Sequence, residues 1–382
     1  MFEPRLKRRA PRVKTRAASL LALAFLLLPF HSAPAGPARQ EPPAAPAPTQ
    51  TPTPTPSPSP TPAPTPDEAD DVERINTDLT NVLLSATDSK RRFVTTLKAE
   101  DLRVLEDGVE QRLVSFQQET DAPLALAVLV DTSASQAGVL RDEQEAARAF
   151  FASVLRPGKD TGAVVSFTGI TRVEQPPTGE RERLNAAIDA TKVLYPVNSP
   201  ECEDEDTPEE VRVRCQTAVW DAIAITSGEV LSRTPETARR AIVLLSDGDD
   251  YSSKLTIYQS VEHATRNNVV VYSIGIRDRD VGVGDLRKDN LRRVSEETGG
   301  RAFFPKNRAE LDSAFAQVER ELRSQYLLSY SPTNKARDGR YRRVTVEIVN
   351  PALRKQKLRL LYRRGYYARG GERPAPAATN DD

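Results

Sequence analysis

Between residues 123 and 324, short continuous apolar runs alternate with segments of helical periodicity. The apolar runs read LALAVLV, TGAVVSF, RRAIVLLS, NVVVYSIGI and GRAFF. The segments between them repeat apolar residues every three or four positions, as in VLRDEQEAARAFFASVL and AELDSAFAQVERELRSQ. Strands that lack polar alternation are buried on both faces, which is typical of parallel strands covered by helices. The pattern therefore predicts an α/β domain over residues 123–324, with a doubly wound, mostly parallel, Rossmann-like sheet.

The segments on either side of this domain, residues 67–122 and 325–368, show the partial alternation of short strands. Examples are LRVLEDGVEQRLVSFQQ, in which Asp107-Gly108 is a hairpin signal, and RYRRVTVEIV. Two arrangements remain open. The strands of both segments pair into one β module, with the α/β domain inserted between them, or each segment forms a small β appendage of its own.

Outside these regions the chain has no pattern that predicts a packed core. A basic stretch precedes the mostly apolar Ala17–Phe30, and APA follows, which predicts a cleaved signal peptide over residues 1–35. An uncleaved anchor and a twin-arginine signal at Arg8-Arg9 are the alternatives. Residues 36–66 form a proline-rich linker, predicted to be extended, because proline favours the polyproline II conformation. Residues 369–382 are predicted to be a disordered tail.

The charges are balanced over the whole chain, with 54 Lys and Arg against 54 Asp and Glu. Without the first 16 residues, 47 basic residues face 53 acidic ones, a net charge of −6. The basic cluster thus lies in the segment predicted to be removed, and nothing in the sequence indicates a nucleic-acid partner. No membrane span is expected after cleavage of the signal peptide.

Cys202 and Cys215 are the two cysteines of the chain. In an oxidising compartment so close a pair is expected to form a disulfide, and two free thiols are the alternative. Together with the signal peptide, this predicts an exported protein that is periplasmic, at the cell surface or secreted. Association with the cell envelope stays open.

Polar side chains follow two of the predicted buried strands. Asp131, Ser133 and Ser135 come directly after LALAVLV, and Asp247 follows AIVLLS. The carboxyl ends of parallel strands lie at one edge of a sheet, where ligands bind in this fold class. Thr217, before a predicted helix, can face the same edge. Carboxylates and hydroxyls are hard oxygen ligands, which suit Mg²⁺ or Mn²⁺ and suit Zn²⁺ poorly.

These residues resemble the metal-ion-dependent adhesion site of the von Willebrand factor type A family. D-x-S-x-S matches Asp131, Ser133 and Ser135, the threonine of the second loop matches Thr217, and the aspartate before glycine matches Asp247. The resemblance covers about 200 residues. The flanking segments are similar to those of a subgroup of exported proteins common in acidobacteria. The resemblance implies that hydroxyls and carboxylates hold the ion, and that its open position accepts an Asp or Glu side chain of a protein partner.

Two local features allow more than one interpretation. The loop before Thr217 carries seven acids between Glu201 and Glu210, which form a solvated face, an accessory Ca²⁺ site or a selectivity rim. A Cys202–Cys215 bridge would brace this loop. Asp249 and Asp250 are expected to cap the following turn or helix. Serines after a strand are also common helix N-caps, so Ser133 and Ser135 have a purely structural alternative.

We therefore expect an exported, metal-dependent binding or adhesion module rather than an enzyme. No G-x-S-x-G, P-loop or H-E-x-x-H motif is present, and the mature chain keeps one histidine, His263, so a catalytic triad lacks its base. A structural envelope scaffold with a vestigial metal site is the alternative. Metal-dependent hydrolysis is a further one.

Overall fold

A computed structural model of the chain describes residues 79–90, 92–118, 121–194, 202, 207–208, 211–212, 215–277 and 286–370. All of these residues belong to the second of two compact units, which spans Glu73–Asp382. The predicted signal peptide, the proline-rich linker, most of the C-terminal tail and most of the acidic run lie outside the described residues. None of the helices in the described ranges is long and apolar enough to cross a membrane.

A six-stranded sheet forms the centre of the α/β domain, in the order β10-β9-β8-β5-β6-β7. The strands are β5 (Leu124–Asp131), β6 (Thr161–Phe167), β7 (Thr171–Thr178), β8 (Arg239–Leu245), β9 (Val269–Ile274) and β10 (Ala302–Phe303). All neighbouring strands are parallel except β6 and β7. The predicted mostly parallel α/β sheet is therefore confirmed. The sequence pattern did not predict β7, which carries Pro176 and Pro177 and lies at the sheet edge, where proline is tolerated.

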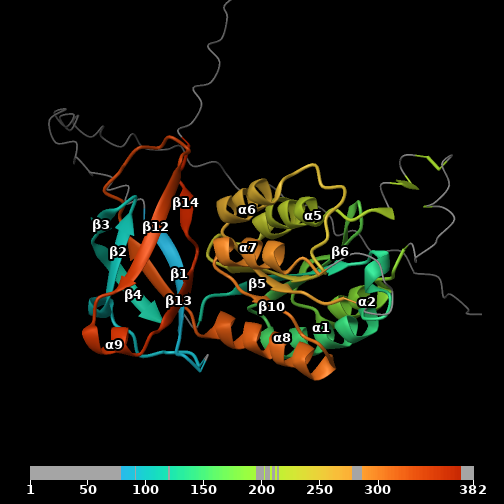
Figure 1. Ribbon diagram of the computed structural model, residues 1–382, viewed down its shortest axis with the longest axis horizontal. Coiled ribbons are helices and arrows are strands. Elements are labelled where there is room, and N and C mark those ends of the chain that lie inside the picture. The colour runs from blue at the N-terminus through green and yellow to red at the C-terminus, as the bar shows by residue number, and fades with distance from the viewer. Residues whose placement is uncertain are drawn as a thin grey trace, which may run out of the picture. The chain divides into compact units, whose positions relative to one another are not determined.

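Helices cover both faces of this sheet (Figure 1). One face packs against α1 (Leu140–Val154), α2 (Arg181–Ala190) and α8 (Arg308–Arg323). The other packs against α5 (Val219–Ile225), α6 (Ile257–Arg266) and α7 (Lys288–Thr298).

The position of strand β5 between two cores explains why its sequence has no polar alternation. Leu124, Leu126 and Val128 belong to the core on one face, and Ala125 and Ala127 belong to the core on the other. Successive side chains of a strand point to opposite faces, so a strand with a core on each side must be apolar throughout.

The strands on the two sides of the α/β domain pair with one another in two four-stranded sheets. The first sheet has the order β13-β1-β11-β4, and the second β14-β12-β2-β3. These strands are β1 (Thr80–Thr87), β2 (Leu102–Glu106), β3 (Val109–Gln111), β4 (Leu113–Gln118), β11 (Tyr326–Tyr330), β12 (Tyr341–Ile348), β13 (Arg359–Tyr362) and β14 (Gly365–Tyr367). Their apolar side chains form one common core. The flanking segments are thus one β module, which also carries the short helix α9 (Pro351–Lys355).

The central strands β5 and β8 bring two distant segments of the chain together. They are parallel neighbours, and Val130 lies opposite Leu245. The next residue of each segment therefore lies at the carboxyl edge of the sheet, Asp131 as the last residue of β5 and Ser246 directly after β8.

Candidate metal centre

Asp131 is fully buried at the end of β5. One carboxylate oxygen, Oδ1, accepts a hydrogen bond from the backbone N–H of Ser133 at 2.9 Å. The other, Oδ2, accepts one from Ser246 Oγ at 2.6 Å, across from β5 to the end of β8. These two bonds hold the carboxylate in one orientation at the sheet edge. Ser246 is a site residue that the sequence analysis missed, because its role depends on the register between β5 and β8.

Ser133 and Ser135 are each 8% exposed, so their hydroxyls lie inside the site. Ser133 precedes a short 3-10 turn, Ala134–Gln136, but its side chain caps no backbone N–H there. Its Oγ instead lies 3.2 Å from Ser135 Oγ. The Ser135 side chain lies close enough to the carboxylate of Asp247 to lower the pKa of that group. Ser133, Ser135 and Asp247 therefore form a contiguous set of oxygen atoms, and a capping role does not explain Ser133.

Asp247 follows β8 and is 1% exposed. Its Oδ1 accepts the backbone N–H of Asp249 at 3.1 Å, whereas Oδ2 is buried without a hydrogen-bond partner. Burial raises the pKa of Asp247. Burial and the neighbouring charge of Asp247 raise the pKa of Asp131. The two buried carboxylates are thus desolvated and repel each other. A bound cation would offset both the desolvation and the repulsion.

Thr217 is positioned at the same edge through its backbone. Its carbonyl oxygen accepts the N–H of Tyr251 at 2.8 Å and of Ser252 at 3.1 Å, in the segment after β8. The next residue, Ala218, donates to Thr168 O, after β6. Thr217 is 6% exposed, and α5 begins two residues later. Within the described ranges, no hydrogen bond joins its hydroxyl to the four residues above.

The expected roles of Asp249 and Asp250 were largely wrong. Asp250 Oδ1 accepts the Ser253 hydroxyl in the following turn, but it also accepts the N–H of Val219 at 2.7 Å, at the start of the earlier helix α5. Asp249 Oδ1 pairs with Arg287 Nε at 2.9 Å instead of capping a helix. The helix that follows is capped by Thr256. These contacts connect the segment after Asp247 to the start of α5 and to Arg287, the residue before α7.

Glu143 is a second residue that the sequence analysis missed. It lies fully buried on α1, and neither carboxylate oxygen has a hydrogen-bond partner. Burial, and then the charges of Asp131 and Asp247, raise its pKa well above the usual value. A sequence signal existed, because Glu143 occupies the apolar stripe of α1, three residues after Leu140 and four before Ala147.

We predict that Glu143→Gln stabilises the metal-free protein at neutral pH. A carboxyl with a raised pKa in the folded state stabilises the fold below its unfolded pKa, and this contribution is lost as the pH rises through the folded pKa. Unfolding by urea without metal should show a gain of about 1–3 kcal/mol at pH 7.5, which shrinks towards pH 4.5. The exposed Glu182→Gln on α2, which makes the same change away from the buried carboxyls, is the control. Equal pH profiles for wild type and Glu143→Gln would contradict the prediction.

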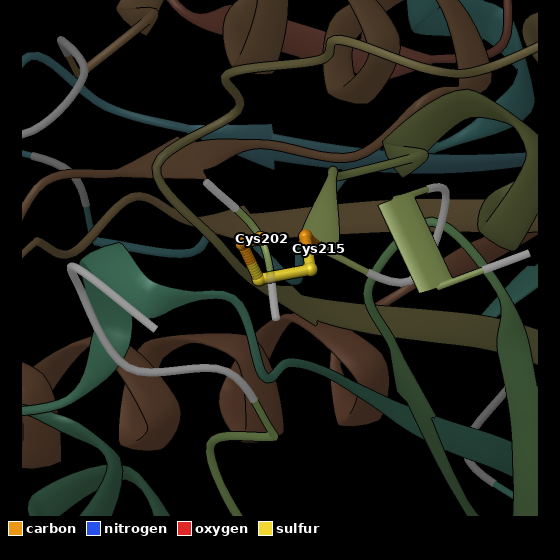
Figure 2. Close-up of a disulfide and its surroundings, with 2 residues drawn as sticks. All are labelled: Cys202 and Cys215. Carbon is orange, nitrogen blue, oxygen red and sulfur yellow. A yellow bond between two sulfur atoms is a disulfide. The ribbon is translucent and has the colours of Figure 1, made fainter. Parts of the chain in front are cut away.

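A disulfide joins Cys202 and Cys215, as the sequence predicts (Figure 2). The Cα atoms lie 5.8 Å apart, and 13 positions separate the two residues along the chain. Cys215 lies two residues before Thr217, so the bridge constrains the loop that presents this threonine. A disulfide fits an oxidising compartment.

Replacing both cysteines by serine should lower the free energy of unfolding by up to about 3 kcal/mol, the chain-entropy value for a loop of this size. It should also weaken binding of a divalent cation at this site several-fold, because the bridge no longer constrains the loop that presents Thr217. Denaturant unfolding and calorimetry of the double variant measure the two effects. Wild-type protein treated with a reducing agent is the matched control and should behave like the variant; unchanged stability in both would refute the prediction.

A comparison with known protein families supplies the identity of this fold. Residues 212–317 match the von Willebrand factor type A domain. The chain contains a von Willebrand factor type A domain. The match includes Thr217 and Asp247, and begins after the segment that carries Asp131, Ser133 and Ser135. This match confirms the predicted resemblance to the family. The similarity of the flanking segments to a subgroup of exported proteins stays a prediction. A sequence comparison with curated proteins gives no match.

Several solved structures are similar to the chain at low identity. BatB from Bacteroides thetaiotaomicron shares 16% identity, over 53% of this chain and 100% of its own, with a TM-score of 0.40. A von Willebrand factor type A protein from Catenulispora acidiphila shares 12%, over 77% and 73%, with a TM-score of 0.43. Proximal thread matrix protein 1 from the mussel byssus, described with a zinc-occupied metal-ion-dependent adhesion site, shares 13%, over 54% and 50%, with a TM-score of 0.41.

The side chains present at the sheet edge of the von Willebrand factor type A domain fit a hard divalent cation. No group of three or more His, Cys, Asp or Glu side chains that could hold a metal ion occurs within the described ranges. The predicted set is of another kind, with two carboxylates and three hydroxyls. Asp247 Oδ2, buried and without a partner beside Ser135, is the observation that favours a ligand there.

Proposed function

We propose that the protein is an exported binding module that uses Mg²⁺, or Mn²⁺, to capture an acidic group of a protein partner. Asp131, Ser133, Ser135, Thr217 and Asp247 would hold the ion. The single observation that carries the proposal is the unpartnered, buried Asp247 Oδ2 beside the hydroxyls and the second carboxylate. An all-oxygen set of this composition favours Mg²⁺ or Mn²⁺ over softer metals.

Some residues of the site orient the two carboxylates, and the carboxylates themselves supply the negative charge. Ser246 and the Ser133 N–H orient the Asp131 carboxylate, while the Asp249 N–H orients that of Asp247. Asp131 and Asp247 supply two negative charges, and the hydroxyls supply neutral oxygen atoms. When bound, the ion supplies positive charge that attracts a carboxylate of the partner.

Capture of envelope proteins with and without a chelator tests this function. We expect immobilised wild-type protein to retain a partner in Mg²⁺ and to release it on chelation. A Glu-containing peptide should compete, whereas the same peptide with Gln should not. Asp131→Ala should retain nothing. The exposed Asp289→Ala, which removes the same charge from the neighbouring helix α7, should behave like wild type.

Two alternatives predict other outcomes of the same assay. Capture that is unaffected by chelator and by Asp131→Ala would favour a structural scaffold with a vestigial metal site. Metal-dependent turnover of a phosphate ester, lost in Asp131→Ala, would favour a hydrolase. We propose that the protein is not an enzyme, because the sequence offers no nucleophile paired with a base.

A further inference from the structure

Glu143 is a buried carboxylate in the first turn of α1, and no contact within the described residues accounts for its presence there. Helix α1 follows β5 after a short loop, so it begins at the carboxyl edge of the sheet. Glu143 belongs to the stripe of α1 that also contains Leu140 and Ala147, and these two residues pack in the core on this face of the sheet. The Glu143 side chain therefore points from α1 towards the sheet, at the edge that carries the metal centre.

The charges that act on Glu143 show that it lies near the two candidate ligand carboxylates. Burial is the main cause of its raised pKa, and the charges of Asp131 and Asp247 come next. The remaining contribution, from Asp142, is also a negative charge. Glu143 thus adds a third buried carboxyl to a site where two already repel each other. Such an arrangement costs stability unless a cation compensates it.

Buried oxygen atoms without a hydrogen-bond donor gather at this edge. Among the described residues they include both carboxylate oxygens of Glu143, Asp247 Oδ2 and the amide oxygen Oε1 of Gln136. Gln136 is fully buried, and its Nε2 donates to Ser135 Oγ at 3.2 Å, so its amide lies beside the candidate ligands. Buried acceptors without donors are rare in folded proteins. A hydrated cation offers both positive charge and O–H donors, because Mg²⁺ keeps several of its water molecules in protein sites.

We propose that Glu143 is a third carboxylate of the metal centre, which strengthens binding of the ion through its charge and through water rather than as a direct ligand. This inference rests on the function proposed above. Direct coordination by three carboxylates does not fit, because the described part of the chain contains no cluster of three acidic side chains that could hold a metal ion. The stability lost by burying Glu143 on an apolar stripe is then offset when the ion binds.

Calorimetric titration of the full chain with Mg²⁺ at pH 8 tests this proposal. Glu143→Gln removes the charge with little change in shape, and Glu143→Leu removes it without placing an amide in the core. Both variants should bind Mg²⁺ at least about tenfold more weakly than wild type, because a unit charge acts strongly over short distances in the protein interior. The exposed Glu182→Gln on α2 makes the same chemical change away from the site and should bind like wild type.

The stability gained on adding Mg²⁺ separates a role at the ion from a purely structural one. At one Mg²⁺ concentration well above both dissociation constants, urea unfolding should show that wild type gains about 1.4 kcal/mol more than Glu143→Gln, which corresponds to the tenfold difference in affinity. A purely structural role would change the stability of the metal-free variant and leave this gain equal to that of wild type.

Two outcomes would overturn the proposal, and the wild-type titration distinguishes them. Equal Mg²⁺ affinity in wild type and Glu143→Gln would show that the ion does not sense Glu143, and the metal-dependent function would stand. A wild-type protein that binds no Mg²⁺ would refute both the role of Glu143 and that function. Circular dichroism checks that the variants fold, and either folded variant is sufficient for the comparison.

Discussion

Replacing Asp131 by alanine should abolish Mg²⁺ binding and leave the domain folded. The variant removes one of the two carboxylates at the sheet edge, and with it half of the negative charge of the candidate ligands. It also removes the acceptor for Ser133 N–H and Ser246 Oγ, which destabilises the fold. Loss of a buried charge that faces Asp247 offsets this cost, because burial and Asp247 both disfavour the ionised form of Asp131.

Thermal unfolding in increasing Mg²⁺ and calorimetry measure this effect. At a Mg²⁺ concentration 100 times the dissociation constant, the ion should stabilise the wild-type protein by about 2.7 kcal/mol and the variant not at all. Asp289→Ala should retain the full gain. A variant that still gains stability from Mg²⁺ would show that the ion binds elsewhere. A wild-type protein that gains none would remove the basis of the proposed function.

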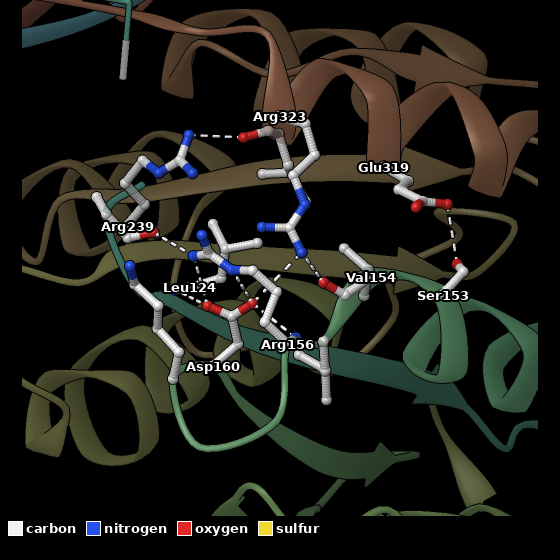
Figure 3. A network of polar contacts seen from close by, with 12 residues as sticks. Leu124, Ser153, Val154, Arg156, Asp160, Arg239, Glu319 and Arg323 are labelled. Carbon is white, nitrogen blue, oxygen red and sulfur yellow. Dashed lines mark hydrogen bonds and ion pairs between the residues drawn. The ribbon is translucent and has the colours of Figure 1, made fainter. Parts of the chain in front are cut away.

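Replacing Asp160 by alanine should cost about 4 kcal/mol of stability, because it breaks a buried ion-pair network. The Asp160 side chain is fully buried. It accepts hydrogen bonds from Leu124 N at 2.9 Å, from Arg156 N at 2.8 Å and from Arg323 Nη2 at 3.3 Å (Figure 3). One carboxylate thus ties the start of β5 to the loop after α1 and to the end of α8. Its removal leaves both arginines without this partner.

The Asp160 carboxylate also makes the free energy of unfolding depend on pH. Burial by itself raises the pKa of Asp160, but the hydrogen bonds and charge of Arg156 outweigh burial and lower the pKa to about 2. A carboxyl with a lowered folded pKa stabilises the fold above its unfolded pKa, near 3.9, and this contribution is lost as the pH falls towards 2. Urea unfolding of wild type between pH 6 and pH 2.5 should show this loss.

Asp160→Asn should be less stable than wild type at pH 6 and should lose less stability on acidification. Asp121→Asn is the control, because Asp121 contacts the same arginine but is 84% exposed. A wild-type stability that stays constant down to pH 2.5 would refute the role of Asp160, as would an Asp160→Asn variant as stable as wild type at pH 6.

Much of the fold and the candidate site could be predicted from local pattern. A strand with a core on both faces must be apolar along its whole length, as β5 is, and a helix on such a sheet must repeat apolar residues every three or four positions. Asp131 and Asp247 end this apolar pattern abruptly. That break, with the D-x-S-x-S spacing, singled out Asp131, Ser133, Ser135 and Asp247 as candidate ligands. Thr217 was added because it precedes a predicted helix and matches the second loop of the von Willebrand factor type A family. The disulfide followed from cysteine count and spacing.

The remaining features depend on contacts between residues far apart in the chain. Only the folded chain pairs β1 with β11 and β2 with β12, because strand pairing is set by register and packing and leaves no local signature. For the same reason, Ser246 becomes a partner of Asp131, and Asp250 caps a helix that precedes it by some 30 residues. Short-range periodicity specifies which face of each element is buried, and tertiary packing alone determines what lies against it.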